Sequence, residues 1–227
     1  MFRRIYGYCE RGFLPGGDSD LFWAEPFNAI TNGAFIIAAL FALALAIKMR
    51  RLDGPTGWLI LITFCVGVGS FLFHTYAMVW AAILDTTPIM IFILSYFAIA
   101  MNRFAGFGWL ASIGLMVAFV AVMIGLSFVL NTFLRDVIGG SVSYVPALMA
   151  LAAVGFWLRA RAHPAGTWLI TVAALFAVSL TARALDRPLC AHYLMGTHWL
   201  WHILNGVVLG TLIVAVIRHS TPRGQKT

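Results

Sequence analysis

Charged residues are scarce in this chain. Only 10% of its 227 residues are Asp, Glu, Lys or Arg, whereas a soluble domain of this size carries about 25%. Hydrophobic residues make up 62% and the mean hydropathy is +0.93, which excludes a water-soluble globular domain. The net charge is +7, yet the basic residues form no stripe and no nucleic-acid-binding motif. The composition therefore predicts an all-α integral membrane protein with no nucleic-acid partner.

Polar interruptions are also few, and they divide the chain into seven apolar stretches. A membrane-spanning helix needs roughly 20 mostly apolar residues, and Gly, Pro, Arg or Asp mark the breaks, as in KMRRLDGPTG and RARAHPAG. The predicted spans are Ala29–Ile47, Gly57–Tyr76, Val79–Ala100, Phe107–Leu130, Gly139–Leu158, Gly166–Ala184 and Thr197–Ile217. The connection around Thr75 to Met78 is very short, so the second and third spans are expected to be adjacent and antiparallel. The chain has no internal repeat and no low-complexity tract, which predicts a single seven-helix membrane domain over residues 1–227.

The two ends of the chain are expected on opposite sides of the membrane. Residues 1–25 lack the apolar core of a signal peptide and are predicted to be an interfacial segment, and residues 218–227 a short cytosolic tail. Lys and Arg favour cytosolic connections. One side carries nine of them: Lys48, Arg50, Arg51, Arg103, Arg159, Arg161, Arg218, Arg223 and Lys226. The other carries six: Arg3, Arg4, Arg11, Arg135, Arg183 and Arg187. This bias predicts a multi-pass protein with its N-terminus outside, in a periplasm or lumen, and its C-terminus in the cytosol.

The few polar residues inside the predicted spans gather at one depth. Ser70 and His74 lie four residues apart at the end of the second span, and so share one helix face. Asp85 lies about six residues into the third span, roughly 9 Å below the interface at 1.5 Å per residue. His198 and His202 are again four apart, at the start of the last span. All five fall in the leaflet on the N-terminal side, and ionisable residues inside a membrane are functional-site candidates.

Three imidazoles near a carboxylate and a hydroxyl match a catalytic zinc site, which has three protein ligands and one open position. Histidines at i and i+4 are a common helical metal clamp. Two simpler interpretations remain for single residues: His74 as a hydrogen-bonded interfacial residue, and Asp85 as the N-cap of a helix that begins at TTPIM. His192 is the one competing ligand on this side, because His163 and His219 lie in connections on the other side.

Non-enzymatic functions are also compatible with these residues. His74 and His198 could be facing axial ligands in a haem-binding redox protein. A receptor could keep the histidines and their metal without hydrolysing a lipid. Asp85 could serve a proton-coupled transporter, although the seven spans show no evident inverted repeat.

The chain resembles the alkaline ceramidases, seven-helix membrane hydrolases in a superfamily that includes the adiponectin receptors. The matching segments are SFLFH with Asp85 eleven residues after His74, GTHWLWHILNG in the last span, and YCE, AEPFNAITN and LDRPLC elsewhere. They extend from residue 8 to residue 206. The resemblance implies an enzyme embedded in the membrane that cleaves the N-acyl amide bond of ceramide or a related N-acyl lipid. The products would be a fatty acid and a sphingoid-type amine.

The same resemblance assigns roles to the gathered polar residues. It implies that His74, His198 and His202 hold a zinc ion, with Ser70 and Asp85 beside it. Zinc activates water and polarises an amide carbonyl. Asp85 would then accept the water's proton and pass it to the leaving amine, while Ser70 would donate a hydrogen bond to the oxyanion.

Animal members of the family also bind calcium near the N-terminus. The residues that match this site are Glu10, Glu25 and Asn28. The positions that depart from the family pattern are Gly7, Tyr8 and Gly12. Calcium takes 6–8 oxygen ligands, so the carboxylate missing at Gly7 weakens the site unless Asp18 or Asp20 replaces it.

The family further joins two cysteines that match Cys9 and Cys190, which implies a disulfide between them here. Both would lie on the outer side, in an oxidising compartment. Cys65, within the second span, is predicted to be an ordinary buried thiol.

Overall fold

The computed structural model describes residues 1, 3–5, 7–12 and 23–220, with only the backbone of residues 11 and 12. Four residues named above lie outside this description: Asp18, Asp20, Arg223 and Lys226. The predicted tail at 218–227 is therefore described only as far as residue 220. Within the described part the chain is helical and forms no strand, apart from one isolated antiparallel bridge between Arg4 and Met78.

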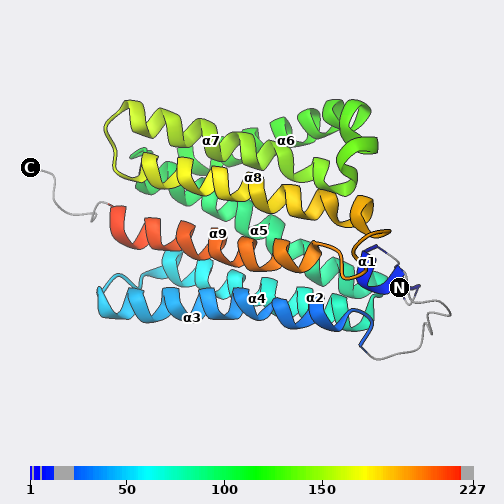
Figure 1. The fold of residues 1–227 in the computed structure, drawn as a ribbon. Coiled ribbons are helices and arrows are strands. Elements are labelled where there is room, and N and C mark those ends of the chain that lie inside the picture. Colours follow the sequence, from blue (N-terminus) through cyan, green and yellow to red (C-terminus); the bar gives the residue numbers. More distant parts are fainter. Residues whose placement is uncertain (2, 6, 13–22, 221–227) are drawn as a thin grey trace, which may run out of the picture.

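The helices form a bundle whose long axes run roughly side by side (Figure 1). In chain order the elements are α1 (Cys9–Gly12), α2 (Pro26–Thr31), α3 (Gly33–Lys48), α4 (Gly54–Tyr76), α5 (Val79–Arg103), α6 (Trp109–Ile138), the 3₁₀ helix η1 (Gly139–Tyr144), α7 (Val145–Ala160), α8 (Ala165–Leu189) and α9 (His198–His219). The last helix, α9, packs against α3 and α8 and lies between them (Figure 1). Most of its side chains are buried, so it forms the centre of the core.

Six described helical segments are long and apolar enough to cross a membrane, where the sequence predicts seven spans. Five of them are α2 with α3, then α4, α5, α8 and α9. The sixth is a continuous helical stretch, Trp109–Ala160, which contains 52 residues and comprises α6, η1 and α7. The chain turns back at η1, so that α7 runs beside α6 in the opposite direction (Figure 1).

Two helix ends differ from the prediction. The fourth predicted span ends at Leu130, but α6 continues to Ile138 through polar residues such as Asn131 and Arg135. Polar side chains are tolerated where a helix leaves the hydrocarbon, so polarity there does not end the helix. The next span was predicted to begin as α-helix at Gly139, yet residues 139–144 form the 3₁₀ helix that reverses the chain.

The connection between α4 and α5 confirms the expected tight antiparallel pair. It is closed by Ala77 in the left-handed conformation, with φ 49°, whose N–H bonds the carbonyl of Phe73. Closer to this connection than to the far ends of the two helices, a Cβ at Gly69 would collide with the backbone carbonyl of Leu84. That carbonyl receives no helical hydrogen bond from Pro88, which has no N–H. The close approach at Gly69 brings the next residues of the two helices together.

At the opposite end of the bundle, Asp53 is the N-cap of α4 and accepts a hydrogen bond from the Thr56 N–H at 3.0 Å. It also forms an ion pair with Arg103, with 2.5 Å between Nη2 and Oδ2. Partial burial raises the pKa of the Asp53 carboxyl, but the hydrogen bonds from Thr56 and Arg103 outweigh it and leave the pKa below its usual value. The free Cys65 on α4 is half-buried, less buried than expected.

Candidate metal centre

Three histidines meet in the core near one end of the bundle, which we call the histidine end. His74 lies in the last turn of α4, and His198 and His202 occupy the first two turns of α9. All three side chains are at most 2% exposed. One ring nitrogen from each lies within 4.8 Å of the other two, so a single ion could contact all three. The competing ligand His192 is exposed and is not part of this group.

Each of these rings also presents a buried nitrogen that has no hydrogen-bond partner in the described chain. These atoms are His74 Nε2, His198 Nδ1 and His202 Nε2. Buried polar atoms in native proteins are nearly always satisfied. Three unsatisfied imidazole nitrogens at one point are therefore well suited to a bound metal ion, and neutral imidazole is a common zinc ligand.

The remaining nitrogens of two rings are held by side chains on α2 or just before it. The carboxylate of Glu25, which is 1% exposed, accepts a hydrogen bond from the Nδ1–H of His74. The hydroxyl of Thr31 lies 3.0 Å from Nδ1 of His202. Metal-binding histidines usually have such a partner on the second nitrogen, because it fixes the tautomer and the orientation of the ring. These partners leave the Nε2 atoms of His74 and His202 directed to the common point.

The start of α9 is fixed by the buried carboxylate of Asp186 in α8. One oxygen accepts hydrogen bonds from the N–H groups of Thr197 and His198, at 2.8 and 2.9 Å. The other accepts from the N–H of Cys9 at 3.0 Å. Gly196 precedes the helix with φ 59°, and a Cβ there would collide with this carboxylate. Asp186 thus acts as the N-cap of α9, which Thr197 does not provide with its own side chain.

A disulfide joins Cys9 in α1 to Cys190 just after α8, with 5.3 Å between the Cα atoms. The pair is separated by 181 residues in sequence. Together with Asp186 it ties the N-terminal segment to the start of α9.

Ser70 and Asp85 lie beside the histidine cluster. Ser70 is buried one turn before His74, and its side chain interacts with the carboxylate of Asp85 across the close contact of α4 and α5. Asp85 is half-buried and lies within electrostatic reach of His74. The interpretation of Asp85 as an N-cap is wrong, because α5 begins six residues earlier, with Met78 as its N-cap.

The residues that match the calcium site are already engaged elsewhere. The two carboxylate oxygens of Glu10 accept hydrogen bonds from the N–H groups of Phe27 and Asn28, at 2.6 and 2.8 Å. Glu25 contacts His74, which leaves Glu25 Oε1 and the side-chain oxygen of Asn28 as the unpartnered oxygens of this set. Two oxygens are far fewer than the 6–8 that calcium needs. The described side chains of this set therefore leave few oxygens for calcium, and calcium binding stays a prediction.

Two residues near the cluster received no role from the sequence. The ring of Tyr8 stacks on that of His198, with 3.6 Å between ring centroids. The guanidinium of Arg183 on α8 donates to the Ser141 hydroxyl at 2.8 Å and lies 5.3 Å from the ring centroid of Tyr144. Arg183 could have been singled out from the sequence, because a charge near the end of an apolar helix is a functional candidate. In the sequence it serves only as one of the basic residues that predict the topology.

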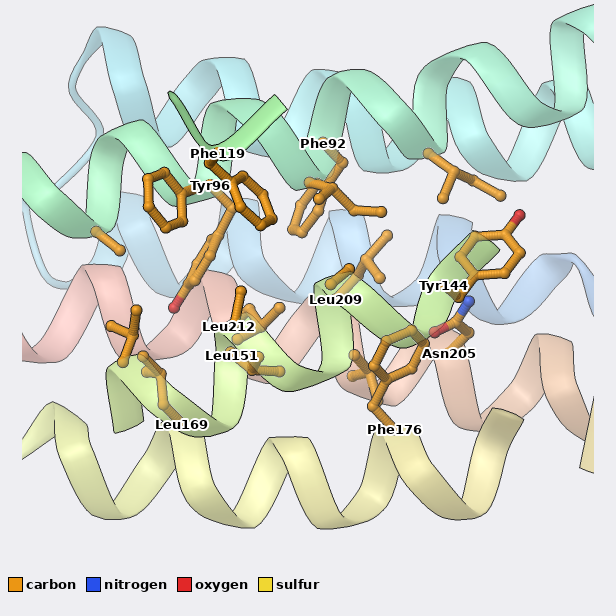
Figure 2. Close-up of a pocket in the computed structure, with 18 residues that line it drawn as sticks. Phe92, Tyr96, Phe119, Tyr144, Leu151, Leu169, Phe176, Asn205, Leu209 and Leu212 are labelled. Carbon is orange, nitrogen blue, oxygen red and sulfur yellow. The ribbon is translucent and has the colours of Figure 1, made fainter. Parts of the chain in front are cut away.

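An apolar cavity of about 80 Å³ extends from this region toward the other end of the bundle. Figure 2 shows Tyr144 and Asn205 at one end of it and Tyr96 with Leu169 toward the other. Asn205 lies one helical turn after His202, so this end of the cavity adjoins the histidine cluster. The lining contains no charged residue. A cavity lined in this way suits an apolar group.

The described part of the chain is thus a helical bundle with apolar helices that can span a membrane, and its three buried histidines could hold a metal ion. A sequence model of one family, described as Ceramidase, matches residues 7–227. The chain therefore belongs to the ceramidase family, as the motifs around the histidines predicted. A comparison with curated proteins finds no match.

Proposed function

We propose that this chain is an intramembrane zinc-dependent amidohydrolase. It cleaves the N-acyl amide bond of ceramide or a related N-acyl lipid to a fatty acid and a sphingoid-type amine. The observation that carries this proposal is the convergence of three buried imidazoles, each with a nitrogen that has no partner among the described residues, next to a serine and a carboxylate. Membership of the ceramidase family supports a hydrolase that acts on an amide bond.

His74, His198 and His202 would hold the metal, with Glu25 and Thr31 fixing two of the rings. When bound, zinc activates a water molecule and polarises the amide carbonyl. The choice of zinc rests on the donor set, because three imidazoles with room for a fourth ligand are typical of catalytic zinc.

Asp85 and Ser70 perform the proton transfer and the charge stabilisation. Asp85 accepts a proton from the attacking water and donates it to the nitrogen of the leaving amine. Ser70, one turn from His74, donates its hydroxyl hydrogen to the oxygen that becomes negative when the carbonyl carbon is attacked. The apolar cavity beside Asn205 (Figure 2) takes the start of the acyl chain in this proposal, and the amide then lies at the histidine cluster.

The haem interpretation is disfavoured by the spacing of the rings. Two imidazoles that bind one haem iron face each other across a porphyrin plane. Here the ring centroids of the three histidines are separated by only 4.5, 4.7 and 5.1 Å, and the three rings surround one point. No pair leaves space for a porphyrin between its members.

We also propose that the chain is one domain that crosses the membrane seven times, with α6 and α7 as separate crossings. Helix α1 and the end of α9 lie at opposite ends of the bundle (Figure 1), and this arrangement supports an odd number of crossings. The outside location of the N-terminal segment, and a cytosolic C-terminus, are supported by the basic residues described above and by the disulfide, which suits an oxidising compartment.

Metal analysis combined with lipid hydrolysis tests this function. The purified protein should contain about one zinc per chain, and His198→Ala or His202→Ala should remove most of it. His192→Ala is the matched control, because His192 is exposed and outside the cluster. Mass spectrometry after incubation with a mixed N-acyl lipid pool should show release of fatty acid. Full zinc content in both cluster variants, or an intense Soret band, would contradict the proposal.

A further inference from the structure

Asn205 is a polar side chain in largely apolar surroundings. It lies on α9 within the last predicted span and is only 2% exposed. It lines the apolar cavity, and Figure 2 shows its amide at the end of that cavity where Tyr144 lies. The amide oxygen, Oδ1, has no hydrogen-bond partner in the described chain. Because an unpaired polar atom removed from water is costly, we expect this oxygen to bind a donor that the protein does not supply.

The neighbouring helices offer no donor to this oxygen. Polar side chains inside a membrane usually bond to a partner on an adjacent helix. On α8 the buried hydroxyl of Ser179 instead donates to the carbonyl of Trp201, one turn before Asn205, at 3.3 Å. The backbone N–H groups in the interior of α9 are committed to carbonyls of the preceding turn. The Oδ1 atom of Asn205 therefore stays open toward the cavity.

A trapped water is a poor partner for Asn205. A buried water typically makes about three hydrogen bonds to polar groups around it. The cavity lining has three polar side chains: Asn205, Tyr144 and Tyr96. Tyr96 lies toward the other end (Figure 2), so that a water beside Asn205 would have Tyr144 as its one further polar side chain. A donor carried by a bound lipid would satisfy Oδ1 better.

The position of Asn205 relative to the metal centre indicates which part of a lipid would carry this donor. Asn205 follows His202 by three residues, so both lie on one face of α9, with Asn205 about 4.5 Å further along the axis. In the proposed function the amide nitrogen stays at the histidine cluster, where Asp85 donates a proton to it. The first carbons of the acyl chain would then lie beside Asn205, where the cavity begins.

We propose that Asn205 selects N-acyl lipids whose acyl chain carries a hydroxyl on its second or third carbon. This hydroxyl donates its hydrogen to Oδ1 of Asn205. The inference rests on the proposed amidohydrolase function and narrows the acyl half of its substrate. An unsubstituted acyl chain would exclude water from this end of the cavity and leave Oδ1 without a donor, and a site built to bond a substrate hydroxyl discriminates against such an analogue.

The test compares kcat/KM for three lipids with the same amine half and chain length, whose acyl chains are unsubstituted, 2-hydroxylated or 3-hydroxylated. The wild type should favour at least one hydroxyacyl lipid by about 10- to 100-fold, the usual effect of a buried polar group left unpaired. Asn205→Leu keeps a branched side chain but removes the acceptor, and should abolish this preference. Asn205→Ala takes its place if the leucine variant does not fold.

Leu209→Met is the matched control. Leu209 lines the same cavity one turn further along α9 and carries no hydrogen-bonding group. This variant should change kcat/KM for all three lipids by the same factor and keep the preference. Absence of a preference in the wild type would overturn the inference. An equal loss for all three lipids in Asn205→Leu would then indicate that Asn205 bonds the amide N–H, and unchanged rates would indicate a bound water.

A binding measurement separates failure of this inference from failure of the proposed function. If no N-acyl lipid is hydrolysed, the proposed function fails, and the Kd values of the same uncleaved lipids still report on Asn205. A Kd at least tenfold lower for a hydroxyacyl lipid, lost in Asn205→Leu and kept in Leu209→Met, supports the hydroxyl site. Equal Kd values for all three lipids would overturn it.

Discussion

Removing the charge of Glu25 should weaken metal binding without changing any ligand. Glu25 is buried, and its contact to Nδ1 of His74 holds that ring with Nε2 directed into the cluster. Loss of such a partner typically costs 10–100-fold in metal affinity, which corresponds to about 1.4–2.7 kcal/mol. Glu25→Ala should show the full effect. Glu25→Gln should show less, because its amide oxygen can still accept the hydrogen bond but carries no charge.

Competition of the purified protein with a zinc chelator measures this affinity directly. The matched control is Glu10→Gln, a carboxylate from the same region that bonds the backbone at the start of α2 and does not contact the histidines. A folded Glu25→Ala protein with wild-type zinc affinity would refute the role of Glu25. Equal losses of zinc affinity in the Glu10 and Glu25 variants would instead indicate that both carboxylates support the same metal site.

Three further perturbations follow from the same contacts. Asp85→Asn should retain zinc and lower kcat by about 10²–10⁴-fold. Near-normal release of fatty acid by this variant would rule out the proton-transfer role of Asp85. Replacing Cys9 and Cys190 by Ala opens a link between residues 181 apart, and should cost roughly 5 kcal/mol of stability in the chain-entropy model. Thermal unfolding without reductant measures this cost, and an unchanged Tm would contradict it. Asp53→Asn should cost at most about 1 kcal/mol, because the ion pair with Arg103 is partly exposed. Since the folded pKa of Asp53 is lowered, this contribution is complete above the unfolded pKa of about 3.9 and disappears as the pH falls through the folded value. The Tm difference from wild type should therefore vanish in acid and persist at pH 7.

The sequence predicts the histidine cluster because helical periodicity converts spacing into position. The i,i+4 pair His198/His202 shares one face of a helix. His74 is predicted near this pair because the end of its span and the start of the last span lie on the same side of the membrane. The partners of these rings could not be found in this way. Glu25 reaches His74 across 49 residues, and that contact depends on where α2 packs. A carboxylate near the N-terminus is equally compatible with a cation ligand, which is how the family pattern assigned it.

The start of α9 shows a similar limit. Thr197 is an ordinary helix-capping residue by type, yet the capping carboxylate comes from Asp186 in the preceding helix. A cap of this kind depends on tertiary packing, so local sequence rules do not detect it. The same holds for Arg183, whose neighbours Tyr8 and Tyr144 come from distant parts of the chain.

The histidine cluster and the residues that support it come from segments far apart in the chain. Cys9 and Glu25 are synthesised before Asp186, His198 and His202. A ribosome-bound chain in which α9 has not yet been made contains only His74 of the three imidazoles. The proposed metal site therefore cannot form gradually during biosynthesis. It is complete only when α9 docks between α3 and α8.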